Sequence, residues 1–422
     1  MSTASTPGTL HGAVDVAIAG GGLVGASLAL ALSQLGLEVA LLEASPFGTA
    51  AQPSFDDRTT ALSNGSRRTF AALGVWPLIE REATAIRRIH VSDQGRFGFA
   101  RLDAQEQGLA ALGFVVTNRI MGAALWRRLA EQKVRVIAPA RVLSMRLAGD
   151  RQRITYEGGA EGPACLEARL AVAADGARST LRQSAGIGAQ TWDYEQVALV
   201  TNVFSQRFHD HVAYERFTSE GPLALLPMTE GRLGLIWTFP PDIATPMASL
   251  DDASFIERLQ RAFGFRLGRF TRVGARQLYP LSLVRSDEYT AERLAIVGNA
   301  AQTLHPIAGQ GFNLGLRDAA SLAEVLADGR AQALAQAGST FDPGDGVLLE
   351  RYREWRAADR TNIVRFTDGL VRLFTQPFGP VKLLRDVGML AFDLMPAAKG
   401  ALSQLSLGAA GRVPRLARGA QL

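Results

Sequence analysis

Short apolar runs, each ended by glycine or by an acidic residue, recur along the amino-terminal part of the chain. The first run, 14–19, is apolar apart from one aspartate and meets three glycines, which predicts a buried parallel strand. Residues 23–35 are rich in alanine and leucine and stop at Gly36, so we expect a helix there. A second, mostly apolar run, 38–42, ends at Glu43 and predicts another strand. The pattern is therefore a strand–helix–strand unit of about 30 residues.

Farther along, the predicted elements change in kind. Thr117 or Asn118 is expected to cap the helix at 117–132. Up to about residue 190 we expect helices at 64–73 and 117–132 and strands at 134–137, 142–147, 154–156 and 169–174. From about 192 to 286 helical periodicity is sparse, and β-rich runs such as 197–204 and 233–239 dominate. A short strand at 294–297 and helical apolar stripes at 345–375 and 381–394 follow.

These elements predict an α/β fold in three parts. The first is a Rossmann-type nucleotide-binding domain, the second an inserted β-sheet domain that holds the substrate, and the third a C-terminal helical region with a basic tail. We expect the first domain to comprise 13–85, 113–190 and 288–340, the inserted domain 86–112 and 191–287, and the helical region 341–422.

Composition narrows the class of protein. The 422 residues are 47% hydrophobic and 20% charged, as expected for a globular protein with a large core. The net charge of +5 fits an acidic partner, a membrane surface or neither, and no nucleic-acid fingerprint is present, so nucleic-acid binding is not expected. We find neither a signal peptide at the start nor an apolar stretch long enough to span a bilayer.

Cysteine and histidine give no sign of a metal site. Cys165 is the single cysteine, in an expected loop, so no intrachain disulfide forms and a reducing cytoplasm is the natural compartment. His209 and His211 share one face of an expected strand but lack further ligands. We therefore expect no metal.

The first motif that carries chemistry is the turn Gly20-Gly21-Gly22-Leu23-Val24-Gly25. Glycine at positions 20, 22 and 25 permits a tight turn and a close approach of the backbone to a pyrophosphate. The phosphates would then meet the free amides and the positive dipole end of the next helix. Glu43 stands where a carboxylate accepts hydrogen bonds from an adenosine ribose. The motif indicates a dinucleotide without separating FAD from NAD.

Two further motifs follow predicted strands. Asp175-Gly176 ends the strand at 169–174, and its simplest interpretation is a turn before a helix capped by Ser179. The third motif covers 298–318 and feeds a helix from about Phe312. Its glycines at 309 and 311 allow close approach to a planar ligand, and the helix start offers amide donors to a partly negative carbonyl or ring nitrogen. The alternative is a glycine-rich connection without a ligand.

In this order and spacing the three motifs resemble those of the para-hydroxybenzoate hydroxylase-type flavoprotein monooxygenases. The resemblance covers roughly residues 14–327. In that family the Asp-Gly segment is associated with both FAD and the pyridine nucleotide, and Asp175 and Gly176 match it. The third motif normally begins Gly-Asp-Ala-Ala-His, whereas Asn299 and Gln302 stand here. Asn299 keeps an acceptor oxygen for a ribityl hydroxyl but carries no charge.

Three stretches look like one subgroup, the 2-octaprenyl-6-methoxyphenol hydroxylases of bacterial ubiquinone biosynthesis. They are 56–63, 115–119 and 298–315. By the family pattern Arg58 and Arg119 lie along the flavin; the alternative is two ordinary surface charges. The resemblance and the motifs together give this FAD-binding set: Gly20, Gly22, Val24, Gly25, Glu43, Arg58, Arg119, Asp175, Gly176, Asn299, Pro306, Gly309, Gln310, Gly311, Phe312 and Asn313.

The resemblance also implies a reaction. An FAD enzyme that uses NAD(P)H and dioxygen would hydroxylate the ring of a polyprenylated phenol through a flavin C4a-hydroperoxide, within a ubiquinone-biosynthesis protein complex. The protein would hold the ring, exclude water and stabilise negative charge on the flavin, with the amides near Phe312 and Asn313 as candidates for the last task. His305 is the candidate catalytic residue, as a proton carrier; the alternative is a packed, hydrogen-bonded histidine.

Two questions stay open at the level of sequence. A prenyl-lipid reductase or dehydrogenase of the same fold, which does not use dioxygen, and a non-catalytic flavoprotein subunit are the alternative functions. The stripe at 381–394 and the tail with Arg412, Arg415 and Arg418 fit either an anionic bilayer surface or a packed helix with a frayed tail. We expect a cytoplasmic protein, with a peripheral position at the inner membrane as the alternative.

Overall fold

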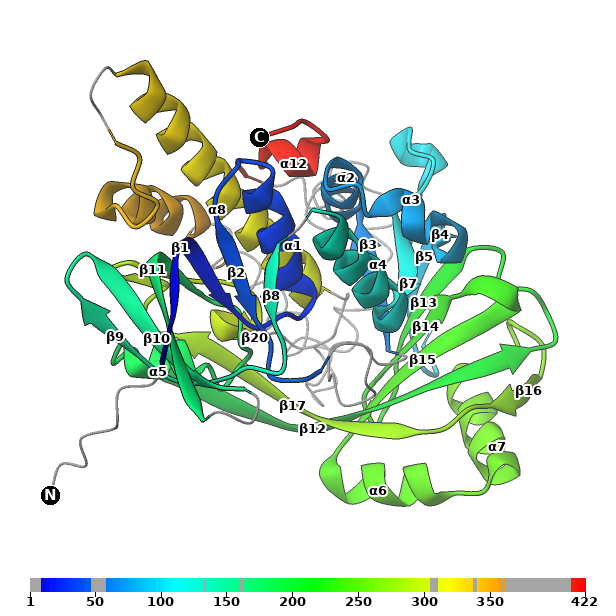
Figure 1. Cartoon of the computed structure of the whole chain (residues 1–422). Coiled ribbons are helices and arrows are strands. Elements are labelled where there is room, and N and C mark those ends of the chain that lie inside the picture. The colour runs from blue at the N-terminus through cyan, green and yellow to red at the C-terminus, as the bar shows by residue number, and fades with distance from the viewer. Residues whose placement is uncertain are drawn as a thin grey trace, which may run out of the picture.

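The computed structural model contains two large sheets and a small one between them (Figure 1). It describes residues 9–46, 58–96, 98–132, 134–158, 162–303, 310–336, 340–357, 360 and 411–422. The sheets have eight, nine and three strands.

The first sheet has the order β18-β19-β11-β1-β2-β8, with β10 paired to β11 and β9 paired to β10. Its strands are β1 (Thr9–Ala19), β2 (Val39–Leu42), β8 (Arg135–Ile137), β9 (Arg141–Ala148), β10 (Arg151–Glu157), β11 (Pro163–Ala173), β18 (Thr290–Ala291) and β19 (Leu294–Ile296). The strands β8, β2, β1, β11 and β19 run parallel to their neighbours. Their carboxyl ends therefore meet at one edge, where ligands bind in open α/β sheets.

Both faces of this sheet are covered. The helices α1 (Leu23–Ser33), α4 (Asn118–Glu131) and α8 (Gln310–Ala335) contribute to the core on one face, which includes Val16 and Ile18 (Figure 1). The β9–β10 hairpin and α5 (Thr180–Ser184) pack on the other face, against Ala17 and Ala19. Because neither face meets water over residues 16–19, this part of β1 is an apolar run without alternation.

The second sheet has the order β20-β17-β12-β15-β14-β13-β5-β6, with β16 paired to β12. Its strands are β5 (Arg88–Asp93), β6 (Phe99–Asp103), β12 (Ala189–Ser205), β13 (Val212–Phe217), β14 (Pro222–Pro227), β15 (Arg232–Phe239), β16 (Phe270–Val273), β17 (Gln277–Ser286) and β20 (Gln302–Thr303). The helices α6 (Pro241–Ser249) and α7 (Asp252–Phe263) cover its outer face, where Trp237 packs near Phe255 (Figure 1).

The small sheet, β3-β7-β4, stands between the other two. Its strands are β3 (Thr59–Ser63), β4 (Thr84–Ile86) and β7 (Gly113–Thr117). The remaining short elements are α2 (Asn64–Ala72), α3 (Trp76–Ile79), α12 (Arg415–Arg418), and the 3₁₀ turns η1 (Glu80–Glu82), η2 (Gln105–Gln107), η3 (Thr229–Gly231) and η4 (Gly298–Ala300). A further helix covers residues 346–357.

The expected α/β fold is confirmed, and the predicted domain boundaries stay a prediction. Two local expectations were wrong. Cys165 is buried within β11 instead of lying in a loop, because β11 begins earlier than its apolar run. His209 and His211 precede β13 in a turn, and Asp210 and His211 have positive φ. At the end of the chain, where a frayed tail was one of the two open alternatives, Leu416 is fully buried.

Two expected helical stretches fall largely outside the described residues. The structure describes the stretch at 345–375 only as far as 357 and at residue 360, and the stripe at 381–394 lies outside it. Among the helices that are described, none combines the length and the apolar character needed to cross a bilayer.

Candidate functional site

The glycine turn between β1 and α1 leaves no room for larger residues. Gly20 has a φ of +102°, and a Cβ there would lie 2.3 Å from the carbonyl oxygen of Ala174. A Cβ on Gly25 would lie 2.0 Å from the carbonyl oxygen of Gly20. Gly22 caps α1 without a side-chain hydrogen bond, so among the described residues no capping side chain takes the first-turn amides of the helix. The turn is therefore a cradle for an anionic group such as a pyrophosphate.

The carboxylate of Glu43 is fixed beside this turn. The side chain is buried; one oxygen accepts a hydrogen bond from the backbone N–H of Gly21 at 2.7 Å and the other from that of Ser45 at 2.9 Å. Trp126 on α4 donates its indole N–H to the carbonyl of Gly21 at 3.1 Å. Each carboxylate oxygen has a second lone pair, so Glu43 keeps acceptor capacity for ribose hydroxyls.

The Asp175-Gly176 turn lies against the glycine turn. A Cβ on Gly20 would come within 2.9 Å of the Cα of Asp175. One oxygen of Asp175 accepts the backbone N–H of Thr180 at 2.7 Å and that of Leu181 at 3.3 Å, while Ser179 caps α5. Burial raises the pKa of Asp175. Its other oxygen, Oδ1, is buried and has no hydrogen-bond partner among the described residues, which leaves an acceptor for a ligand.

The third motif packs on the first. Gly298 has a φ of +61°, and a Cβ there would lie 3.2 Å from the side chain of Val24. A Cβ on Gly315 would meet both Val24, at 2.9 Å, and the Cα of Gly298, at 3.0 Å. These close approaches bring η4 and α8 against the start of α1. Asn299 is exposed at this junction.

The start of α8 is joined to β3 and α2 by one side chain. Asn313 accepts hydrogen bonds from the backbone N–H of Ser63 at 2.9 Å and the hydroxyl of Ser66 at 2.7 Å, and donates to the carbonyl of Ala61 at 2.9 Å. The ring of Phe312 lies 6.0 Å from that of Phe70, centre to centre. Open space surrounds Gly311, and Gln310 opens the helix. His305, Pro306 and Gly309 lie outside the described residues.

The two predicted flavin arginines have different surroundings. The guanidinium of Arg58 lies 4.7 Å from the ring centre of Tyr279 on β17, so it stands between the small sheet and the second sheet. The carbonyl of Arg58 accepts the backbone N–H of Asn118. Arg119 is exposed in the first turn of α4. The structure thus brings Arg58 into contact with the second sheet.

A buried ion cluster, which sequence reasoning missed, holds the third motif. One oxygen of Asp318 on α8 contacts Arg356 at 2.8 Å and Arg360 at 3.2 Å. The other accepts the backbone N–H of Gly298 and the side-chain amide of Gln302, both at 3.2 Å. Gln302, which stands where the family pattern has histidine, therefore helps to fix η4. The available signal was an acidic residue inside an apolar helix, matched by two arginines four positions apart.

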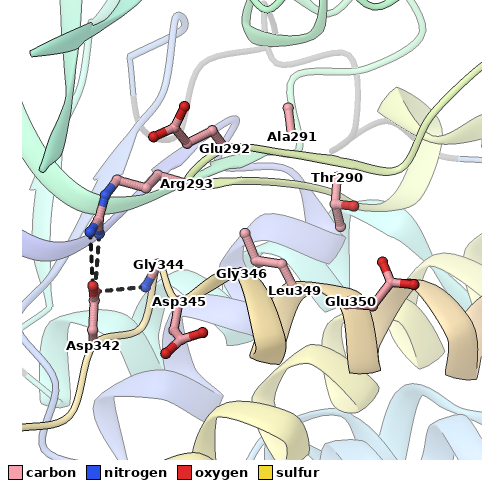
Figure 2. Close-up of a pocket in the computed structure, with 10 residues that line it drawn as sticks. All are labelled: Thr290, Ala291, Glu292, Arg293, Asp342, Gly344, Asp345, Gly346, Leu349 and Glu350. Carbon is pink, nitrogen blue, oxygen red and sulfur yellow. Dashed lines mark hydrogen bonds and ion pairs between the residues drawn. The ribbon is translucent and has the colours of Figure 1, made fainter.

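A surface hollow of about 600 Å³ lies elsewhere (Figure 2). It is lined by residues of the β18–β19 turn and by the chain from Asp342 to Glu350. Across it Arg293 forms a two-pronged contact with Asp342, at 2.9 and 3.1 Å, and donates to the carbonyl of Arg169. None of its lining residues belongs to the three motifs.

Three observations fit FAD at the edge of the first sheet where the carboxyl ends of its parallel strands meet. The glycine turn is a cradle that a Cβ would fill, Glu43 is a buried acceptor beside it, and Oδ1 of Asp175 is a buried acceptor without a partner in the described chain. The motifs also extend from this cradle to the start of α8, as a long dinucleotide requires.

Comparisons with known proteins agree with this fit. The family model for the FAD binding domain matches residues 13–366. The ubiquinone hydroxylase UbiL of Rhodospirillum rubrum is 37% identical over 427 residues, covering 100% of this chain and 96% of the relative. The 3-demethoxyubiquinol 3-hydroxylase of Escherichia coli is 31% identical over 398 residues, covering 93% and 98%.

A solved structure shows the same fold. The p-nitrophenol 4-monooxygenase PnpA of Pseudomonas putida superposes with a TM-score of 0.77 at 19% identity, covering 95% of this chain and 99% of that one. The expected resemblance to the para-hydroxybenzoate hydroxylase-type monooxygenases is confirmed. The chain belongs to the FAD binding domain family of flavoproteins.

Proposed function

We propose that this protein is an FAD-dependent hydroxylase that adds a hydroxyl group to the aromatic ring of a polyprenylated phenol in ubiquinone biosynthesis. The observation that carries the proposal is the end-to-end match with relatives named as ubiquinone hydroxylases, on a chain whose glycine cradle fits FAD. FAD, when bound, supplies the redox chemistry that activates dioxygen, and NAD(P)H is the co-substrate that supplies electrons.

The adenosine half of FAD is assigned to the edge formed by β1 and β2. The amides of Gly22, Val24 and Gly25 would hold the pyrophosphate, supported by the positive end of the α1 dipole. Gly20 would contribute through the shape of the turn, because its own amide donates to the carbonyl of Leu42 at 2.8 Å. Glu43 would accept hydrogen bonds from the ribose, because its carboxylate is already oriented by the Gly21 amide. Both tasks are binding tasks and move no proton.

The flavin half is assigned to the other two motifs. Asp175, Gly176 and Asn299 would bind the ribityl chain. Gln310, Gly311, Phe312 and Asn313 would present backbone amides of the α8 start to the ring, and Pro306 and Gly309 precede them in the sequence. Arg58 and Arg119 would lie along the ring. His305 stays a candidate proton carrier.

The protein has two further tasks in the reaction. It must hold the phenol ring against the cofactor and keep water away from the reacting atoms, because water uncouples electron transfer from hydroxylation. We assign both tasks to the small sheet and the inner face of the second sheet, which meet where a Cβ on Gly234 of β15 would lie 2.9 Å from the hydroxyl of Thr59 on β3.

The proposal is tested in a strain that lacks the gene. Mass spectrometry of its quinone intermediates should show a prenylated phenol that lacks one ring hydroxyl, and restoring the gene should remove it. Accumulation of a lipid with an additional double bond would instead support the reductase alternative. An unchanged intermediate profile would contradict both enzymes and leave a non-catalytic subunit of the biosynthetic complex.

We also propose that the enzyme works at an anionic membrane surface, where a polyprenylated phenol resides. Phe208 and Phe265 are 54% and 64% exposed. Their segments are neighbours, because the backbone N–H of Arg207 donates to the carbonyl of Leu267 at 3.0 Å. The cationic aromatic surface consists of Arg207, Phe208, Phe265, Arg266, Arg269 and Arg272, all exposed.

The charge of this surface favours anionic lipid. None of its four arginines pairs with a carboxylate within the part of the chain that the structure describes, and Asp210 is the acid nearest along the chain. The C-terminal tail, which the sequence offered as a membrane-binding segment, forms ion pairs within the protein. Arg412 and Arg415 lie 3.6 and 3.7 Å from Glu324. Exposed aromatic and cationic side chains together bind anionic interfaces.

Flotation with phosphatidylglycerol vesicles tests the surface. The double variant Phe208→Ser with Phe265→Ser should float less than the wild-type protein. A matched control, Leu334→Ser with Val347→Ser, removes apolar residues that are 77% and 61% exposed on other elements and should float normally. Equal flotation of both variants would contradict this membrane assignment. Co-purification of other ubiquinone-biosynthesis proteins with the wild-type chain tests the complex.

A further inference from the structure

The second sheet has one fully packed face and one that is only half filled. On the outer face Leu223, Leu225, Leu235 and Trp237 are completely buried under α6 and α7. The strand registers place Val91, Glu215, Ala224, Ile236 and Val200 in one row across the inner face, because each pairs with the next. All five are half-buried. Packing therefore does not fill the inner face along this row.

The inner face looks toward the FAD-binding motifs. Gly234 lies two residues before Ile236 on β15 and so shares its face, and a Cβ there would meet Thr59 of β3 at 2.9 Å. Tyr279 of β17 pairs with Ala198, two residues before Val200, and lies under Arg58. The half-buried row thus belongs to the face that meets the flavin side of the molecule.

Glu215 is the carboxyl group in this row. Its neighbours on adjacent strands are Val91 and Ala224. On its own strand, Ala213 and Phe217 lie two residues before and after it and share its face. Among the described residues its carboxylate has no hydrogen bond and no ion pair. A half-buried carboxylate among apolar neighbours is hydrated less well than one in bulk water, which favours a ligand that donates a hydrogen bond to it.

Asp93 and Arg58, which also stand on this face, lie outside the row of Glu215. Asp93 pairs with Phe217 and is one row away, and Arg58 stands at the β17 end of the sheet. Tyr214 and Arg216, which flank Glu215 along β13, alternate to the outer face, where Arg216 donates to the carbonyl of Ala262 on α7. Burial alone raises the pKa of Glu215, to about 7.

We propose that Glu215 is a substrate-positioning residue that accepts a hydrogen bond from the ring hydroxyl of the phenol. This inference rests on the proposed function. The ring would lie on the row formed by Ala224, Ile236 and Val200, and the carboxylate at its end would select a ring that carries a free hydroxyl. No proton leaves the phenol in this step, since Glu215 only accepts the hydrogen bond. A site built for a hydroxyl rejects an analogue that lacks the donor.

The test compares two ligands and two substitutions in the FAD-loaded enzyme. The ligands are a short-chain prenylated phenol and its methyl ether, which has no hydroxyl donor; equilibrium dissociation constants are measured for both. Glu215→Leu should weaken binding of the phenol about tenfold or more and leave the ether unchanged, because a hydrogen bond to a charged group is lost. Glu215→Gln keeps a neutral acceptor, so its affinity for the phenol should lie between those of the wild-type enzyme and Glu215→Leu.

The affinity for the phenol, measured as a function of pH, gives a second test, because a purely structural role of Glu215 would not make the affinity depend on pH in this way. The ionised carboxylate is the stronger acceptor, so wild-type affinity for the phenol should fall as the pH drops below about 7. The Glu215→Gln variant should lose this dependence. Glu257→Leu, an exposed glutamate on α7 of the outer side, is the matched control and should behave as wild type.

The outcomes separate this inference from the proposed function. If the wild-type enzyme hydroxylates the phenol but Glu215→Leu binds phenol and ether as wild type does, the positioning role is overturned. If Glu215→Leu weakens phenol and ether equally, the residue shapes the site without contacting the hydroxyl, and the proposal is also overturned. If the wild-type enzyme does not hydroxylate the phenol, the proposed function itself fails.

Discussion

The glycine cradle makes the sharpest prediction, through the substitution Gly25→Ala. A Cβ at this position would lie 2.0 Å from the carbonyl oxygen of Gly20, whereas ordinary contact begins at 3.4 Å. The turn and the start of α1 must therefore separate by about 1.4 Å, the difference between these distances. Such a shift removes the amides from the pyrophosphate. Losing two hydrogen bonds to a charged group costs about 3 kcal/mol, or roughly a hundredfold in affinity.

FAD affinity, measured by titrating the apoprotein and following flavin fluorescence, is the assay. Gly346→Ala is the matched control, because Gly346 also lies in the first turn of a helix but a Cβ there would meet nothing within 4 Å. The control should bind FAD as wild type does. If Gly25→Ala binds FAD within about threefold of the control, far less than the hundredfold derived from two lost hydrogen bonds, the role of the cradle is refuted.

Three further predictions concern single polar side chains. Asn313→Ala should lower the free energy of unfolding in urea by about 3 kcal/mol, since three buried hydrogen bonds are lost. Asp318→Asn leaves two buried arginines without their carboxylate and should cost about 3–5 kcal/mol in the same assay, whereas Glu350→Gln on an exposed pair should change little. Burial raises the pKa of Glu215 from 4.5 to about 7, so Glu215 ionises at a lower pH in the unfolded chain than in the folded protein. The free energy of unfolding of the wild-type protein should therefore fall as the pH rises from 4.5 to about 7. Glu215→Gln should therefore raise the melting temperature relative to wild type above pH 7 and not below pH 4.5; equal melting temperatures throughout would contradict the shift.

The strand–helix–strand unit could be predicted because its signals are local. The apolar run of β1, the glycines after it and Glu43 all lie within one short segment, and each has one structural meaning there. The α8 motif was recognised for the same reason. Where a local signal was ambiguous, prediction failed: Cys165 stands among small and charged residues that resemble a loop, but its strand is fixed by pairing with β1 and β10.

The contacts that join the motifs could not be predicted, because they connect distant parts of the chain. Asn313 and Ala61 are 252 positions apart, and the pairing of Asp318 with Arg356 depends on how two helices pack. Likewise, the position of Glu215 on the inner face, beside Val91, follows only from the strand registers and could not be predicted from the sequence. A one-residue slip in register would have moved it to the packed outer face.

Oxygen labelling of the product is the decisive measurement for the proposed hydroxylation. The FAD-loaded enzyme is supplied with NADPH, a prenylated phenol and isotopically labelled dioxygen, and the product is analysed by mass spectrometry. We expect a product that carries one labelled oxygen atom on the ring, formed only when dioxygen is present. A product without label, or reduction of the substrate in the absence of dioxygen, would contradict the proposed hydroxylation.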